Sequence, residues 1–182
     1  MALSATIYNI EIDLADSDRG VYESLELRVA RHPSESEEYL VTRVLAYALE
    51  FADGIEFSRG ISDPDEPTIS VRDLTGALRA WIEIGNPDAA RLHKASKASP
   101  RVAVYTHKDP AQLVARLQGE RIHKVSAIEL WAIDRAFIAQ LVKRLDRRMS
   151  FSLSVADREL SVSFDSETLT GAIVRHPLTL QV

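Results

Sequence analysis

Three acidic residues lie close to a predicted β-hairpin and could act together on a cation. Asp65 and Glu66 stand in a Pro-rich loop just before the hairpin, and Glu83 lies near the end of its second strand. If the two strands pair antiparallel around a turn near Thr75, Glu83 lies opposite Pro67, at the open end. A slip of one residue exchanges Asp65 for Glu66 as the nearer acid, so both stay candidates.

Two converging carboxylates suit a hard divalent cation, because Mg²⁺ takes oxygen ligands and needs only one or two carboxylates from the protein. Glu83, together with Asp65 or Glu66, is therefore predicted to bind a Mg²⁺ or Mn²⁺ ion. Such an ion stabilises charge on a phosphodiester and lowers the pKa of its bound water, as hydrolysis requires.

A basic helix is predicted directly after Glu83. Asn86-Pro87-Asp88 is typical of a helix start, with Asn86 as the cap, and the helix carries Arg91, Lys94 and Lys97. If it runs back over the sheet, Lys94 comes level with Glu83 and reaches a phosphate bound there. The alternative is that the acids form a solvated loop and that the bases form the wet face of an ordinary amphipathic helix.

An earlier helix is predicted to open with Ser34 and Glu37, whose spacing is that of a capping box. Glu35 and Glu38 lie in its predicted first turn and are candidate members of the site, Glu35 as a metal ligand and Glu38 as a catalytic acid. Acids are also expected at this position simply because the helix dipole stabilises them there.

Hydrophobic periodicity predicts an α/β (α+β) fold, with a mixed central sheet flanked by helices, in a single domain over residues 1–182. Hairpins are expected at both ends of the chain. The predicted strands are 6–14, 21–29, 55–58, 69–73, 77–84, 102–106, 125–133, 151–155 and 160–164; the predicted helices are 34–52, 87–99, 110–117 and 135–147.

Composition narrows the class of protein further. Apolar residues make up 46% and charged residues 27%, which is typical of a globular chain and gives no sign of a membrane span. The sequence has no cysteine and no visible signal peptide, so we expect a cytoplasmic location and no membrane partner. The net charge of −5 argues against indiscriminate coating of nucleic acid. The P-loop, G-x-S-x-G and dinucleotide motifs are also missing.

Several motifs together resemble the YaeQ family, whose fold is a variation on the PD-(D/E)XK (restriction-endonuclease-like) core. They are Ala30-Arg31-His32-Pro33-Ser34-Glu35, Phe57-Ser58-Arg59-Gly60, Asp65-Glu66-Pro67, Asp73-Leu74-Thr75-Gly76, Trp81-Ile82-Glu83-Ile84-Gly85 and Lys94-Ala95-Ser96. The resemblance implies a helix, a strand, a hairpin and a second helix as the core. It also implies three site acids: Glu35 or Glu38 from the first helix, Asp65 at the hairpin with Asp73 as a weaker candidate, and Glu83.

The resemblance has one departure, because Gly85 stands where the Glu-x-Lys pattern has its lysine. Lys94 on the following helix is the matching residue, with Lys97 and Arg91 beside it. We therefore expect a metal-dependent, nuclease-like phosphodiesterase acting on nucleic acid. The alternative is a catalytically degenerate binding or regulatory module of the same fold. A small-molecule enzyme using the same cleft is a third reading.

Overall fold

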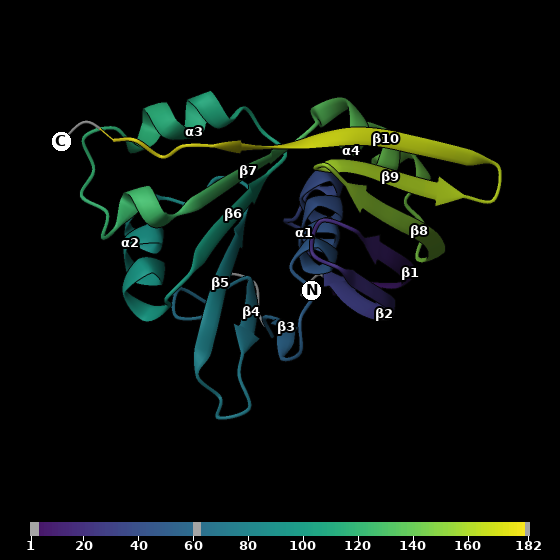
Figure 1. The fold of residues 1–182 in the computed structure, drawn as a ribbon, viewed down its shortest axis with the longest axis horizontal. Helices are drawn as coiled ribbons and strands as arrows, with labels where there is room; N and C mark the ends of the chain where they lie inside the picture. The colour runs from purple at the N-terminus through teal and green to yellow at the C-terminus, as the bar shows by residue number, and fades with distance from the viewer. Residues whose placement is uncertain (1–3, 60–62, 181–182) are drawn as a thin grey trace. The chain divides into compact units, whose positions relative to one another are not determined.

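The computed structural model describes residues 4–59 and 63–180 of the chain. The described residues form two compact units: unit 1 lies within residues 1–49 and 133–173, and unit 2 lies within residues 50–132 and 174–182. Strands and helices alternate along the chain in a mixed α+β fold, as predicted (Figure 1). The expectation of a single domain stays a prediction.

Unit 1 is built on long strands with one buried face. β1 (Thr6–Asp16) pairs antiparallel with β2 (Val21–Arg31) and parallel with β8 (Arg148–Ala156). β9 (Glu159–Phe164) then pairs antiparallel with β8 and with β10 (Glu167–His176), which gives the order β2-β1-β8-β9-β10. Alternate residues of β1 are buried, so strand periodicity accounts for this sheet.

Two helices of unit 1, α1 (Glu37–Leu49) and α4 (Arg135–Arg144), pack against each other and against side chains of β1 and β8. Ser36 caps α1, since its hydroxyl accepts a hydrogen bond from the Tyr39 amide at 3.1 Å. The predicted cap, Ser34, is wrong: its hydroxyl instead lies 2.7 Å from the His32 ring. Two cap-forming residues stand two positions apart here, and the local pairing of Ser34 with His32 decides between them.

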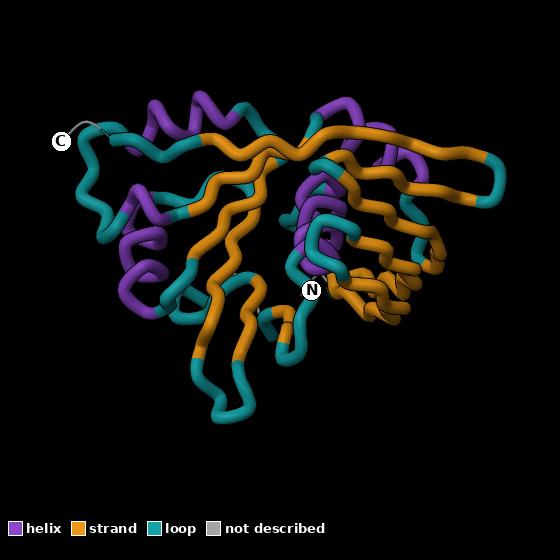
Figure 2. Tube along the Cα trace, in the orientation of Figure 1, coloured by secondary structure: helices purple, strands orange, loops and turns teal. Residues whose placement is uncertain are grey.

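Unit 2 combines an antiparallel and a parallel half, and Figure 2 marks its strands, helices and loops by colour. Its strands are β3 (Ile55–Phe57), β4 (Ile69–Arg72), β5 (Leu78–Ile84), β6 (Val102–Thr106) and β7 (Glu129–Ile133), in the order β7-β6-β5-β4-β3. α2 (Ala89–Ala98), α3 (Pro110–Leu117) and the 3₁₀ turn Val125–Ala127 complete the unit. Side chains of β5, β6, α2 and α3 share one apolar core, which includes Trp81, Leu92 and Leu113.

Most predicted elements are confirmed, and β6 and α3 have the predicted bounds. One strand was missed: β10 contains Gly171, which reads as an interruption. In the structure a Cβ at Gly171 would lie 2.5 Å from Cβ of Phe137, so only glycine fits beneath α4. The start of the predicted strand 125–133 is also wrong, because Val125–Ala127 form a 3₁₀ turn. Among the described residues, no helix is long and apolar enough to cross a membrane.

Candidate functional site

The open end of the β4–β5 hairpin differs by one residue from the predicted register. Ile69 pairs with Ile82, and the ladder shifts between Val71 and Arg72 because β5 carries Arg79 as an extra residue. This bulge places Thr68, and not the predicted Pro67, next to Glu83. The difference matters chemically, because proline has no N–H or hydroxyl to donate.

Glu83 is buried, with only 5% of its side chain exposed, and both carboxylate oxygens accept hydrogen bonds. Oε1 accepts from the Trp81 indole at 2.6 Å and from the Thr68 amide at 3.4 Å. Oε2 accepts from the Thr68 hydroxyl at 3.2 Å and from Nε of Arg91 at 2.8 Å. The four donors compensate for the cost of burying this charge.

Arg91 joins Glu83 to the preceding loop. One terminal nitrogen of its guanidinium donates to the Asp63 carbonyl at 3.1 Å, and the other donates to the Glu66 carbonyl at 2.7 Å. The guanidinium carbon lies 5.7 Å from the centre of the Trp81 ring, within range of a cation–π contact. We call Glu83, Thr68, Trp81 and Arg91 the Glu83 cluster.

Lys94 pairs with Asp65, so the structure brings the predicted base to one of the two predicted loop acids. Lys94 and Asp65 are 46% and 73% exposed, and the pair therefore lies at the surface. The Glu66 side chain and Lys97 are also exposed. α2 begins later than predicted: Asp88, not Asn86, caps it by accepting from the Arg91 amide at 2.8 Å.

Gly85 explains why this chain has no lysine two residues after Glu83. Its φ angle is 82°, in the left-handed region that glycine adopts without strain and other residues avoid. Its amide donates to the Tyr105 carbonyl at 2.8 Å, which holds the turn between β5 and α2 against β6. A lysine at this position would be strained.

Asp73 lies at the turn end of the hairpin, whereas Glu83 lies at the open end, so the structure does not bring these two acids together. The Asp73 carboxylate accepts from the Thr75 hydroxyl at 2.6 Å, from the amides of Thr75 and Ala77, and from Arg79. The Thr75 hydroxyl contributes most to lowering the pKa of Asp73 from 3.8 to about 2. Asp73 therefore organises the turn.

The pKa of Asp73 gives a prediction for acid solution. A lowered pKa means that the charged carboxylate adds stability above pH 3.8, and that this contribution is lost as the pH falls toward about 2. A carboxyl ¹³C NMR titration should place the Asp73 midpoint near 2. Thr75→Ala should raise that midpoint, and Thr75→Ser should preserve it. Equal midpoints in the two variants would contradict the role given to the hydroxyl.

Glu35 and Glu38 belong to unit 1. Glu35 precedes α1 and is buried; it forms an ion pair with Arg43 at 3.2 Å and accepts from the His32 amide at 3.3 Å. Its predicted place in the first turn of the helix is therefore wrong. Glu38 lies in that first turn and is exposed. Their participation in a site with Glu83 stays a prediction.

The predicted metal ligands do not fit a divalent cation in the arrangement observed. Both oxygens of Glu83 are occupied by protein donors, and Asp65 faces Lys94. Within residues 4–59 and 63–180, no group of three or more histidine and acidic side chains is placed to hold a metal ion. Two cationic side chains stand where the predicted ion would stand, so the acids are neutralised from within the chain.

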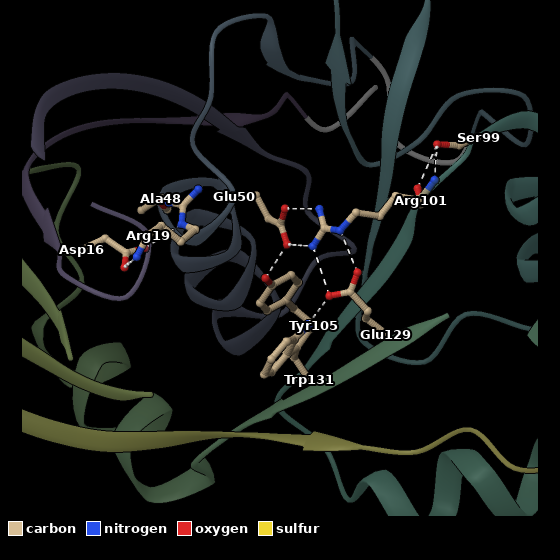
Figure 3. A network of polar contacts seen from close by, with 9 residues as sticks. All are labelled: Asp16, Arg19, Ala48, Glu50, Ser99, Arg101, Tyr105, Glu129 and Trp131. Carbon is tan, nitrogen blue, oxygen red and sulfur yellow. Dashed lines mark hydrogen bonds and ion pairs between the residues drawn. The ribbon is translucent and has the colours of Figure 1, made fainter. Parts of the chain in front are cut away.

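A second polar network in unit 2 links residues far apart in the sequence (Figure 3). Arg101 donates to both oxygens of Glu50, at 2.6 and 2.9 Å, and to both oxygens of Glu129, at 2.6 and 3.2 Å. The Tyr105 hydroxyl donates to Glu50 at 2.5 Å, and the Trp131 indole donates to Glu129 at 3.3 Å. We call these five residues the Glu50 network.

The pKa values in the Glu50 network follow from its charges and burial. The hydrogen bonds that Arg101 donates to Glu50 contribute most to raising the pKa of Arg101 above its ordinary value; burial opposes them, and the bonds to Glu129 add to the rise. Burial, reinforced by the negative charge of Glu50, raises the pKa of Tyr105 well above its ordinary value. Burial acts to raise the pKa of Glu129, but the bonds from Arg101 outweigh it and lower that pKa. At neutral pH these shifts keep Arg101 and Glu129 charged and Tyr105 a neutral phenol.

Sequence reasoning missed most of the donors around these acids. Trp81 could have been found, because residues two apart in a strand face the same side, and Trp81 precedes Glu83 by two. Thr68 depends on the bulge at Arg79. The Glu50 network joins residues about fifty positions apart, so no local pattern of spacing points to it.

The fold and site together define a class: a mixed α+β protein with two acid–base pairs at the open end of a β-hairpin. The family model described as "YaeQ protein" matches residues 1–173. The chain therefore belongs to the YaeQ family.

Relatives and solved structures agree with this assignment. The uncharacterized protein YaeQ of Escherichia coli K12 is 33% identical over 171 residues, which cover 93% of this chain and 94% of the relative. The Salmonella typhi YaeQ is 32% identical over 164 residues, covering 90% and 91%. The YaeQ crystal structure from Xanthomonas axonopodis pv. citri has a TM-score of 0.80 at 30% identity, with 97% of this chain and 100% of that chain covered. The Pseudomonas syringae structure has a TM-score of 0.82 at 29% identity, covering 94% and 95%.

Proposed function

We propose that this protein is a catalytically degenerate nuclease-fold module that binds nucleic acid through the basic side chains of α2. The observation that carries the proposal is the occupancy of Glu83, whose two oxygens bind Trp81, Thr68 and Arg91. A carboxylate already committed to protein donors offers little to a metal ion. Gly85, at a φ angle where lysine would be strained, supports the same reading.

A PD-(D/E)XK-like core belongs to this proposal. Supporting it, the chain runs through a helix (α1), a strand (β3), a hairpin (β4–β5) and a second helix (α2), in the order that the resemblance implies. β5 is followed through α2 by the parallel strand β6. A cytoplasmic location is part of the same proposal and is supported by the absence of cysteine from the sequence.

The distribution of charge favours nucleic acid as the partner. The sequence of unit 2 contains twelve acidic and twelve basic residues, so the net charge of −5 resides entirely in unit 1. α2 carries Arg91, Lys94 and Lys97 and no acid. The exposed Lys94 and Lys97 lie one turn apart on this helix and present positive charge to successive phosphates.

Fluorescence anisotropy with labelled single- and double-stranded DNA and RNA tests the binding. Because each neutralised phosphate releases about 0.9 counterion, two lysine contacts give a slope of about −2 in log K against log salt on duplex DNA. The double variant Lys94→Ala/Lys97→Ala should weaken binding and flatten that slope by about 2. The matched control removes two exposed cations from α4, Arg135→Ala/Lys143→Ala, and should leave the slope unchanged. Equal losses in both double variants, or no binding at low salt, would refute the proposal.

A metal-dependent phosphodiesterase is the second candidate, favoured by the pairing of Lys94 with Asp65 near Glu83. In this reading Mg²⁺ or Mn²⁺ would supply Lewis-acid chemistry, and Glu83, Asp65 and Lys94 would be the residues involved. Incubation of the wild-type protein with DNA and RNA in Mg²⁺ or Mn²⁺ distinguishes the two candidates. Cleavage that disappears in Glu83→Gln would replace the first proposal with the second.

A further inference from the structure

The guanidinium of Arg91 is surrounded by oxygen atoms. Its three nitrogens each donate to a different oxygen acceptor: Oε2 of Glu83 at 2.8 Å, the Asp63 carbonyl at 3.1 Å and the Glu66 carbonyl at 2.7 Å. Only 22% of the side chain is exposed, and the Trp81 ring lies 5.7 Å from the guanidinium carbon. A single cation is thus coordinated by one carboxylate and two backbone carbonyls.

These acceptors have the chemistry of a site for a hard metal ion. Carboxylate and backbone carbonyl oxygens are the ligands that Ca²⁺, Mg²⁺ and Mn²⁺ prefer. Asp65 lies between Asp63 and Glu66 in the sequence, offers a further carboxylate and is paired with Lys94. In a solvated acidic loop these oxygens would face water, whereas here those of Asp63, Glu66 and Glu83 converge on one cation.

The loop is also held in shape by its own contacts. The Asp65 amide donates to the Asp63 carboxylate at 2.9 Å, and the Glu66 amide donates to the Asp63 carbonyl at 3.3 Å. Thr68, at the end of the loop, donates twice to Glu83. The two carbonyls therefore face Arg91 from a turn that is closed by its own hydrogen bonds and anchored to Glu83 at Thr68, which is the preorganisation a cation site requires.

We propose that Arg91 is a built-in cation occupying a latent divalent-metal site formed by Glu83 and the carbonyls of Asp63 and Glu66. Its tethered charge satisfies the oxygens without any ion from solution and fastens the loop over Glu83. Since guanidinium stays protonated at every physiological pH, the substitution is permanent. The inference does not depend on nucleic-acid binding, because it concerns only which cation these oxygens hold.

Titration with MnCl₂, followed by calorimetry, tests the inference directly. Arg91→Ala should bind one Mn²⁺ ion about tenfold or more tighter than the wild-type protein, because it exposes the oxygen set. Tb³⁺ luminescence sensitised by the adjacent Trp81 should rise in the same variant. Adding Glu83→Gln to Arg91→Ala should abolish both signals, since the negative ligand is lost. If Arg91→Ala unfolds, Arg91→Met serves instead, because it keeps an apolar side chain against Trp81 while removing the cation from the same site.

The wild-type protein gives an independent readout. Mn²⁺ should leave the NMR signal of the Trp81 indole N–H sharp, since that group bonds to Glu83 at 2.6 Å and would be broadened by an ion bound there. Broadening in the wild type, or equal Mn²⁺ affinity of the wild type and folded Arg91→Ala, would overturn the inference. A failure of nucleic-acid binding would leave these results unaffected, so the two proposals fail separately.

Discussion

Glu83→Ala is expected to lower the free energy of unfolding by about 3–5 kcal/mol, the range for removing one partner of a buried ion pair. The substitution leaves the Trp81 indole and the Thr68 hydroxyl without their acceptor. It also leaves Arg91 largely buried without its counter-charge. Urea denaturation at pH 7, followed by tryptophan fluorescence, measures the loss.

Asp65→Ala is the matched control. It also removes a carboxylate that pairs with a cation of α2, but this pair is exposed and should contribute less than about 1 kcal/mol. Similar losses in the two variants would show that the Glu83 cluster contributes little to stability. For assays of function the conservative Glu83→Gln is therefore the better variant. Glu83→Ala removes the carboxylate and also destabilises the fold, so a loss of activity in that variant would have two possible causes.

Gly54→Ala should be the second severe substitution, with an expected cost of about 3 kcal/mol or more. Gly54 has a φ of 86°, and a Cβ there would lie 1.9 Å from the carbonyl oxygen of Arg72. The Arg72 amide donates to the Gly54 carbonyl at 3.0 Å, so relief of the clash would pull β3 from β4. Thermal or urea denaturation gives the magnitude.

Gly76→Ala separates the two causes of that cost. Gly76 has a φ of 83°, but nothing lies within 4 Å of the position of an added Cβ. Only the strain of the left-handed backbone applies, which is about 1–2 kcal/mol. If Gly54→Ala destabilised the protein no more than Gly76→Ala, the close approach to Arg72 would not be important.

Periodicity was sufficient for most of the fold. β6 and α3 could be bounded from sequence because Val102–Thr106 is an unbroken apolar run, and because Asp109 with Pro110 marks a helix start. Helix starts were harder wherever several residues could cap. Asn86 and Asp88 both qualify, and the backbone turn at Gly85 leaves Asp88 in the capping position.

The candidate site could be located from sequence but not its internal bonds. A helix running back over the sheet was expected to bring Lys94 level with Glu83, and in the structure Lys94 pairs with Asp65. That Arg91, rather than a metal ion, would meet Glu83 did not follow, because helical spacing places Arg91 and Lys94 on one face without saying which acid each reaches. The bulge at Arg79 also leaves no mark in the alternation of β5, whose last five residues are all buried.

Tyr105 gives unit 2 an optical property. Its hydroxyl donates to Glu50 at 2.5 Å, and its raised pKa keeps it a phenol in alkaline solution where exposed tyrosines have become tyrosinates. In the unfolded chain Tyr105 has its ordinary pKa of about 10. The contribution of the buried phenol to stability is therefore present below pH 10 and is lost as the pH rises above 10. The ultraviolet absorbance of the Tyr105 tyrosinate therefore appears only when the Glu50 network opens. That absorbance reports the opening of unit 2 without an added label.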